Sequence, residues 1–216
     1  MVNRLDFGTV LKEGFGYGMK NIPSLLGAIV LWLVTIWIPY VNVGTTIAIR
    51  TLPLQLSRGE IFSPLSIFDK KYYRYMGEYF LTSGFRMVGI CGAATFLFFP
   101  AIAVSFAWSL AILLLLDKGL NAAEAIRLSN KLTYGNKWTM FFVSFVLGLV
   151  YLIVCWIMTL ILRPLIAAVD SMAEAIMLGF FIVNLFLALL VAFMAFSMGC
   201  QASIYGTLSQ NIEEQH

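Results

Sequence analysis

The sequence is poor in the residues that soluble domains and metal sites use most. Charged residues make up 12% of the 216 residues, about half of the roughly 25% usual for a soluble domain. The single histidine, His216, is the last residue, so we expect no metal or proton-transfer site built on histidine. Three cysteines lie in apolar runs without CxxC spacing, and we interpret them as small packing residues: Cys91, Cys155 and Cys200.

Patterns that indicate an enzyme are also missing. No carboxylate lies deep inside an apolar run, and we find no nucleophile with a neighbouring base and no phosphate-binding glycine loop. We therefore predict that the protein is not an enzyme and has no catalytic residue, metal site or cofactor. We expect no nucleic-acid partner, because the basic residues are better explained by orientation in a membrane.

What the sequence has in abundance is apolar residues, which make up 61% of the chain. They recur in long runs, and a helix of roughly 20 apolar residues crosses a bilayer. The pattern predicts an all-α, polytopic membrane protein, a single membrane domain over residues 1–216 with six transmembrane helices and interfacial amphipathic helices. We expect proline-containing breaks at Pro39-Tyr40, Phe99-Pro100 and Arg163-Pro164. The predicted spans are residues 22–38, 41–56, 79–98, 101–116, 138–162 and 176–208.

The segment before the fifth span predicts an amphipathic helix over residues 122–134. Asn121 is a suitable N-cap with Glu124 three residues later, and Gly135 can end the helix. One face is apolar or small, with Ile126 and Leu132 facing inward, and the other is charged. The helix either rests on the membrane surface, which we favour, or forms a docking surface for a partner.

A weak internal repeat suggests two related halves, approximately residues 1–116 and 117–216. Residues 6–21 align without gaps on residues 121–136, with Asp6 matching the cap Asn121. A further interfacial helix is expected to start at Ser63-Pro64, because tyrosines and other large residues then fall on one face. These residues are Phe68, Tyr72, Tyr75, Met76 and Tyr79.

The distribution of basic residues predicts the orientation in the membrane. Eleven of the fourteen lysines and arginines fall within residues 1–20, 57–77 and 117–137, which six spans place on one side. Because cations concentrate on the cytoplasmic side, both termini are expected in the cytoplasm. A five-span alternative merges residues 22–49 into one kinked helix and separates these basic segments, so we prefer six spans.

Two stretches together resemble a known group of membrane proteins. They are AEAIRLSNKLTYGNKWTMFF and the proline-broken FFPAIAVSFAWSLAILLLLDKGL before it. The chain resembles bacterial six-span membrane proteins of unknown function that are allied to the membrane domain of glycerophosphoryl diester phosphodiesterases, best over residues 80–160. The resemblance implies a fold in a bacterial inner membrane and no catalytic residue, and no phosphodiesterase domain is present. The residues that carry it are Pro100, Ala125, Ser129, Gly135, Lys137 and Phe141.

Polar residues inside the spans are the candidate binding residues. Arg50 and Arg86 lie at matched depth on successive spans, about 12 Å from the cytoplasmic boundary at 1.5 Å per residue. Either they snorkel to the headgroups or pair with Glu78 or Asp117, or they line a pocket for an anionic headgroup or substrate. Asn184 is expected to bond a neighbouring helix.

The predicted function is a non-enzymatic membrane module, a scaffold or accessory subunit that binds membrane lipids or other membrane protein subunits. The alternative is a transporter or channel for a small anionic or amphiphilic substrate. Ala195, Gly199 and Ser203 recur every four residues along the last helix, which suits close helix packing. We expect this stripe to pack within the chain rather than between chains.

Overall fold

All regular structure in the described part of the chain is helical. The computed structural model describes residues 4–213, and His216 lies outside them. Short breaks divide the chain into successive helices, two of which are 3-10 helices (η1 and η2). In chain order the elements are α1 (Phe7–Thr35), α2 (Pro39–Arg50), α3 (Leu52–Ser57), η1 (Pro64–Phe68), η2 (Lys70–Tyr75), α4 (Met76–Phe96), α5 (Phe98–Ala107), α6 (Ala111–Lys118), α7 (Ala122–Thr133), α8 (Lys137–Ala167) and α9 (Met172–Glu213).

Four helical segments are long and apolar enough to cross a membrane. They are α1, the combined α5–α6 segment Phe98–Lys118, α8, and α9 over Met172–Gln210. The all-α prediction is confirmed for the described residues, and these segments support the membrane class. The α2–α3 pair and α4 are not among the four. Six spans and two similar halves therefore stay predictions.

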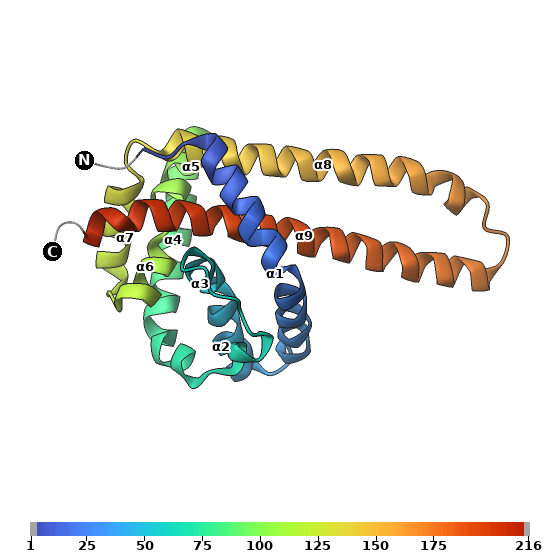
Figure 1. Ribbon diagram of the computed structural model, residues 1–216, viewed down its shortest axis with the longest axis horizontal. Coiled ribbons are helices and arrows are strands. Elements are labelled where there is room, and N and C mark those ends of the chain that lie inside the picture. Colours follow the sequence, from blue (N-terminus) through green and yellow to red (C-terminus); the bar gives the residue numbers. More distant parts are fainter. Residues whose placement is uncertain (1–3, 214–216) are drawn as a thin grey trace.

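The longest helices pair in two ways that Figure 1 shows clearly. α8 and α9 lie side by side as a hairpin that extends away from the other helices, and α1 crosses the C-terminal half of α9. The crossing is close because glycines meet there: a Cβ placed on Gly199 would lie 2.2 Å from the carbonyl oxygen of Gly14. Ser203 donates a 2.7 Å hydrogen bond to Glu13 across the same pair. The small residues of α9 thus pack within the chain, as we predicted.

The amphipathic helix forms as predicted, and its apolar face packs against other helices of the chain. The side chain of Asn121 accepts a 2.9 Å hydrogen bond from the Glu124 N–H, and the left-handed Gly135 follows the helix end. The buried residues Ala125 and Leu132 pack against other helices of the chain, with Ala125 in a cluster with α6. Ile126 and Leu132 thus face inward, as we predicted, and the opposite face of α7 is exposed. A position of this helix at the membrane surface stays a prediction.

α7 also stabilises a break that the sequence pattern did not predict. The predicted span 101–116 is interrupted at residues 108–110, between α5 and α6. The hydroxyl of Ser129 donates to the Ala107 carbonyl at 2.7 Å and accepts the Leu110 N–H at 3.2 Å. Backbone groups released by a broken helix must find other partners when water is excluded. Ser129 supplies them, which explains a fully buried hydroxyl on α7.

Several predicted boundaries are wrong. α1 runs without interruption from its amphipathic start through Pro23 to Thr35. The N-terminal half of the chain therefore has no break at the position that corresponds to the end of α7 in the second half. The break before α5 falls at Leu97, whose extended backbone separates α4 from α5. α8 continues through Pro164 to Ala167, because one proline removes only one backbone hydrogen bond near the helix end.

The predicted interfacial helix after Ser63 is also wrong. Asp69 has an extended backbone and its carboxylate accepts the Lys71 N–H, which divides the segment into η1 and η2. Tyr72 is buried in the core and does not share an exposed face with the other tyrosines. Tyr73 packs so closely on Gly44 that a Cβ there would lie 2.5 Å from the tyrosine ring. This segment therefore packs on α2, and its position at the membrane interface stays a prediction.

Candidate functional site

Arg50 and Arg86 lie on two helices, α2 and α4, that pack against each other. Arg50 is the exposed last residue of α2, where a cation interacts favourably with the negative end of the helix dipole. Arg86 lies on α4, which packs against α2, and Arg50 is near enough for the two positive charges to repel each other. The two arginines that the sequence predicts at the same membrane depth thus lie on helices that are packed together.

No acidic side chain compensates this pair within residues 4–213. Neither arginine takes part in any of the three ion pairs found there. The Nε atom of Arg86 is shielded from solvent and has no hydrogen-bond partner among the described residues. Arg86 is thus a partly buried cation without an acidic partner, whereas Arg50 is exposed. Buried charges are normally paired, so Arg86 is the residue of the two that needs an anion.

The two carboxylates expected to pair with these arginines are used elsewhere, so that expectation is wrong. Glu78 accepts a 2.9 Å hydrogen bond from the Ala122 N–H and so caps the start of α7 from α4. Asp117, whose side chain is 6% exposed, forms an ion pair with Arg58 and accepts a 2.5 Å hydrogen bond from the Tyr205 hydroxyl. Asp117 thereby joins the ends of α3, α6 and α9, a role that sequence spacing did not indicate.

The chemistry of the two arginines suits an anion with several oxygen atoms. A guanidinium group presents parallel N–H donors that match phosphate and carboxylate, and two such groups can hold one anion from two sides. Arg50 stands immediately before the break at Thr51 that separates α2 from α3. One turn along α4 from Arg86, Gly89 lies against the Trp108 ring at the α5–α6 break. Both arginines therefore lie beside interrupted helices.

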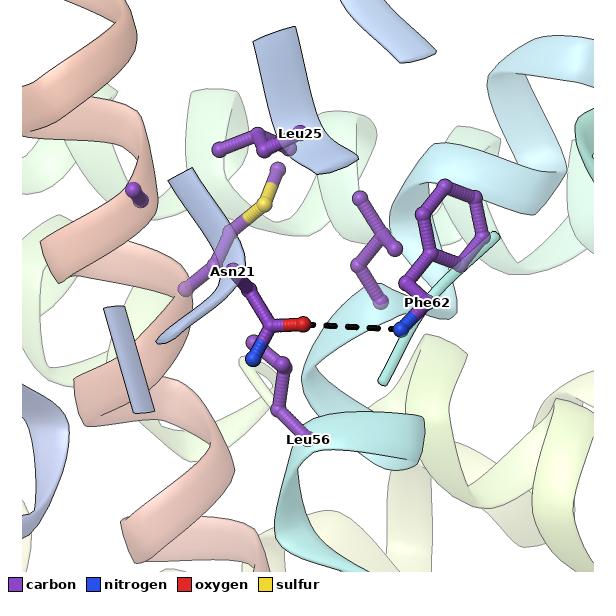
Figure 2. A pocket seen from close by; sticks show the side chains of 7 residues that line it. Asn21, Leu25, Leu56 and Phe62 are labelled. Carbon is purple, nitrogen blue, oxygen red and sulfur yellow. Dashed lines mark hydrogen bonds between the residues drawn. The ribbon is translucent and has the colours of Figure 1, made fainter. Parts of the chain in front are cut away.

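A second polar side chain in the interior has a structural role instead. Figure 2 shows Asn21 of α1 pointing toward Phe62, whose N–H donates to the Asn21 Oδ1 atom at 3.4 Å. The cavity beside them measures about 10 Å³, which holds one water molecule at most. Asn21 fixes the loop between α3 and η1 to α1 and leaves no room for a ligand.

The remaining polar candidates do not form a site. Asn184 donates to the Phe180 carbonyl of its own helix at 2.8 Å, so its predicted bond to a neighbouring helix is wrong. Cys200 packs against Gly14 as expected, whereas Cys91 is exposed on α4 and fills no space in the core. No group of three or more metal-ligating side chains occurs between residues 4 and 213.

Comparisons with protein-family models, with curated proteins and with solved structures found no match to this chain.

Proposed function

We propose that this chain is a non-enzymatic integral membrane module that binds an anion between α2 and α4. The observation that carries the proposal is the pair Arg50 and Arg86, two neighbouring cations without an acidic partner among the described residues. The anion is a phosphate or carboxylate group, carried by a membrane lipid headgroup or by a small soluble molecule. As a scaffold or accessory subunit, the module would recruit such lipids or other membrane proteins.

Lysine substitutions test the site, because lysine keeps the charge and loses the bidentate geometry. Arg50→Lys and Arg86→Lys should fold normally and bind the anion about three- to tenfold more weakly, the equivalent of about one charge-assisted hydrogen bond. Arg127→Lys, on the exposed face of α7, is the matched control and should bind as the wild type does.

Native mass spectrometry after incubation with phosphatidylglycerol, and separately with glycerol phosphate or inorganic phosphate, measures the retained anion. Retention of phosphatidylglycerol alone that falls in both lysine variants assigns the site to a lipid headgroup, and retention of the soluble phosphates that falls in them assigns it to a small anion. Absence of any bound anion from the wild-type protein would refute the site.

The alternative function is a transporter of a small anionic or amphiphilic substrate. The interruptions at Thr51 and at residues 108–110 favour it, since substrate sites in transporters are often built where helices are discontinuous. Uptake of radiolabelled glycerol phosphate into proteoliposomes tests this function. Uptake above that of protein-free vesicles, reduced in Arg86→Lys, would favour transport over the module.

We further propose a six-span arrangement with both termini in the cytoplasm of a bacterium, in its inner membrane. The grouping of eleven of the fourteen basic residues in three segments supports this orientation, and the resemblance to the glycerophosphodiesterase-allied membrane proteins agrees with it. A cysteine introduced at Ser171 should react with a membrane-impermeant maleimide on intact cells, whereas one at Asn130 should not. Equal labelling of both positions would contradict the arrangement.

A further inference from the structure

A second cavity lies between α5 and the first turns of α8. Its volume is about 420 Å³, within the range of about 300–1,000 Å³ typical of small-molecule sites. Four aromatic side chains contribute to its walls, from both helices: Phe99, Phe106, Trp138 and Phe141. Neither Arg50 nor Arg86 lines this cavity.

One cation lines this otherwise apolar cavity. Lys137 is the sole charged residue among the side chains that line it, and it is half-buried. Its Nζ atom donates to the side-chain oxygen of Asn130 at 3.2 Å, and it belongs to none of the ion pairs within residues 4–213. The positive end of the α8 dipole adds to its field. The cavity therefore has apolar walls and a single positive charge, Lys137, at the start of α8.

We propose that this cavity binds one acyl chain of an anionic membrane lipid, with the lipid phosphate beside Lys137. The apolar wall matches the hydrocarbon chain, and the uncompensated cation matches the phosphate. The site is independent of Arg50 and Arg86, so it stands if the anion site between α2 and α4 fails.

Photo-crosslinking tests the acyl-chain part of the inference. The probe is phosphatidylglycerol with a diazirine on one acyl chain, added to the purified full chain in nanodiscs, and the crosslinked peptides are identified by mass spectrometry. Crosslinks should concentrate within residues 99–106 and 137–141. Ala103→Trp fills the cavity from an exposed position on α5, so folding should be preserved while these crosslinks fall about tenfold.

The control for this variant is Ala94→Trp, at an exposed position on α4 that does not line the cavity, which should crosslink as the wild type does. Thermal unfolding of both variants reports on folding. Unchanged crosslinking of folded Ala103→Trp, or crosslinks spread evenly along the exposed length of α8, would overturn the proposal and indicate ordinary surrounding lipid.

The charge part is tested with Lys137→Gln. Phosphatidylcholine with the same labelled chain provides the reference, and the ratio of the two lipids crosslinked measures the preference for an anion. This preference should fall about two- to fivefold, as expected for one partly exposed ion pair. Lys131→Gln, on the exposed face of α7, should leave it unchanged. An unchanged preference in Lys137→Gln would refute the role of the lysine.

Discussion

Replacing Gly199 by alanine should weaken the packing of α1 against α9. The added Cβ would lie 2.2 Å from the Gly14 carbonyl oxygen and 3.0 Å from the Gly18 nitrogen. Both atoms belong to the backbone, so no side-chain rotation can relieve the overlap. The two helices must move apart by at least roughly 1.2 Å before the contact becomes an ordinary one.

The magnitude follows from two opposing effects. Alanine favours a helix over glycine by about 1 kcal/mol, and this gain is expected anywhere in a helix interior. Overpacking a close contact costs about 1–3 kcal/mol, and a backbone-to-backbone overlap belongs at the upper end. Moving the helices apart also disturbs the stacked rings of Phe15 and Phe196, whose centroids are 5.0 Å apart. We expect a net loss of about 2 kcal/mol.

Gly179→Ala is the matched control, because it makes the same change in the same helix. A Cβ on Gly179 meets nothing within 4 Å, so only the helix propensity should change. Unfolding in detergent, followed by circular dichroism against increasing sodium dodecyl sulfate, should show opposite signs for the two variants. If Gly199→Ala is as stable as Gly179→Ala, the close approach of α1 and α9 is wrong.

Two further predictions concern the carboxylates. Asp117→Asn should cost about 2 kcal/mol of unfolding free energy, because it removes the charge that holds Arg58 and the Tyr205 hydroxyl; Arg58→Gln should cost less, since the arginine side chain is 55% exposed. Unfolding in the same detergent assay measures both, and a larger loss in Arg58→Gln would contradict this account. The Thr9 N–H lowers the pKa of Asp6 below its ordinary 3.8, so the cap stabilises the fold above that value and is lost as the pH falls through the lowered pKa. The acid-induced drop in melting temperature should be smaller in Asp6→Asn, and an identical pH profile would contradict the capping role.

Local signals in the sequence predicted local structure well. The cap at Asn121, the stop at Gly135 and the small-residue stripe at Gly199 each act through neighbours a few residues away or through one helix face. Such patterns depend on backbone geometry that is the same in any fold. They were therefore predictable without knowing which helix would lie opposite.

Contacts between distant segments were not predictable in the same way. The apolar face of α7 indicated burial, yet an apolar face alone does not distinguish lipid from protein. The break at residues 108–110 depends on Ser129, about twenty positions later, and nothing in the apolar run itself indicates it. Asp117 likewise stands at the end of an apolar run, and its partners Arg58 and Tyr205 come from opposite directions along the chain.

For the candidate site, the sequence predicted the two arginines, and the structure adds that their helices are packed together. Equal depth on successive spans predicted that Arg50 and Arg86 are neighbours, and their helices α2 and α4 do pack against each other. That Glu78 and Asp117 are occupied elsewhere could not be inferred, because both stand at the predicted cytoplasmic ends of spans, on the same side as the arginines. Binding of an anion by Arg50 and Arg86 stays a prediction, which the lysine variants of these two residues test.

The crossing of α1 and α9 has a consequence for how the protein is made. Glu13 and Ser203, which bond across this crossing, are separated by 190 residues. At about 5–20 residues per second of synthesis, α1 waits roughly 10–40 s for its partner to leave the ribosome. During that time the surface around Gly14 and Gly18 has no helix against it and is open to other membrane segments. We expect biogenesis of this chain to depend on an insertase or chaperone that shields α1, and a chain truncated before α9 to remain bound to that factor.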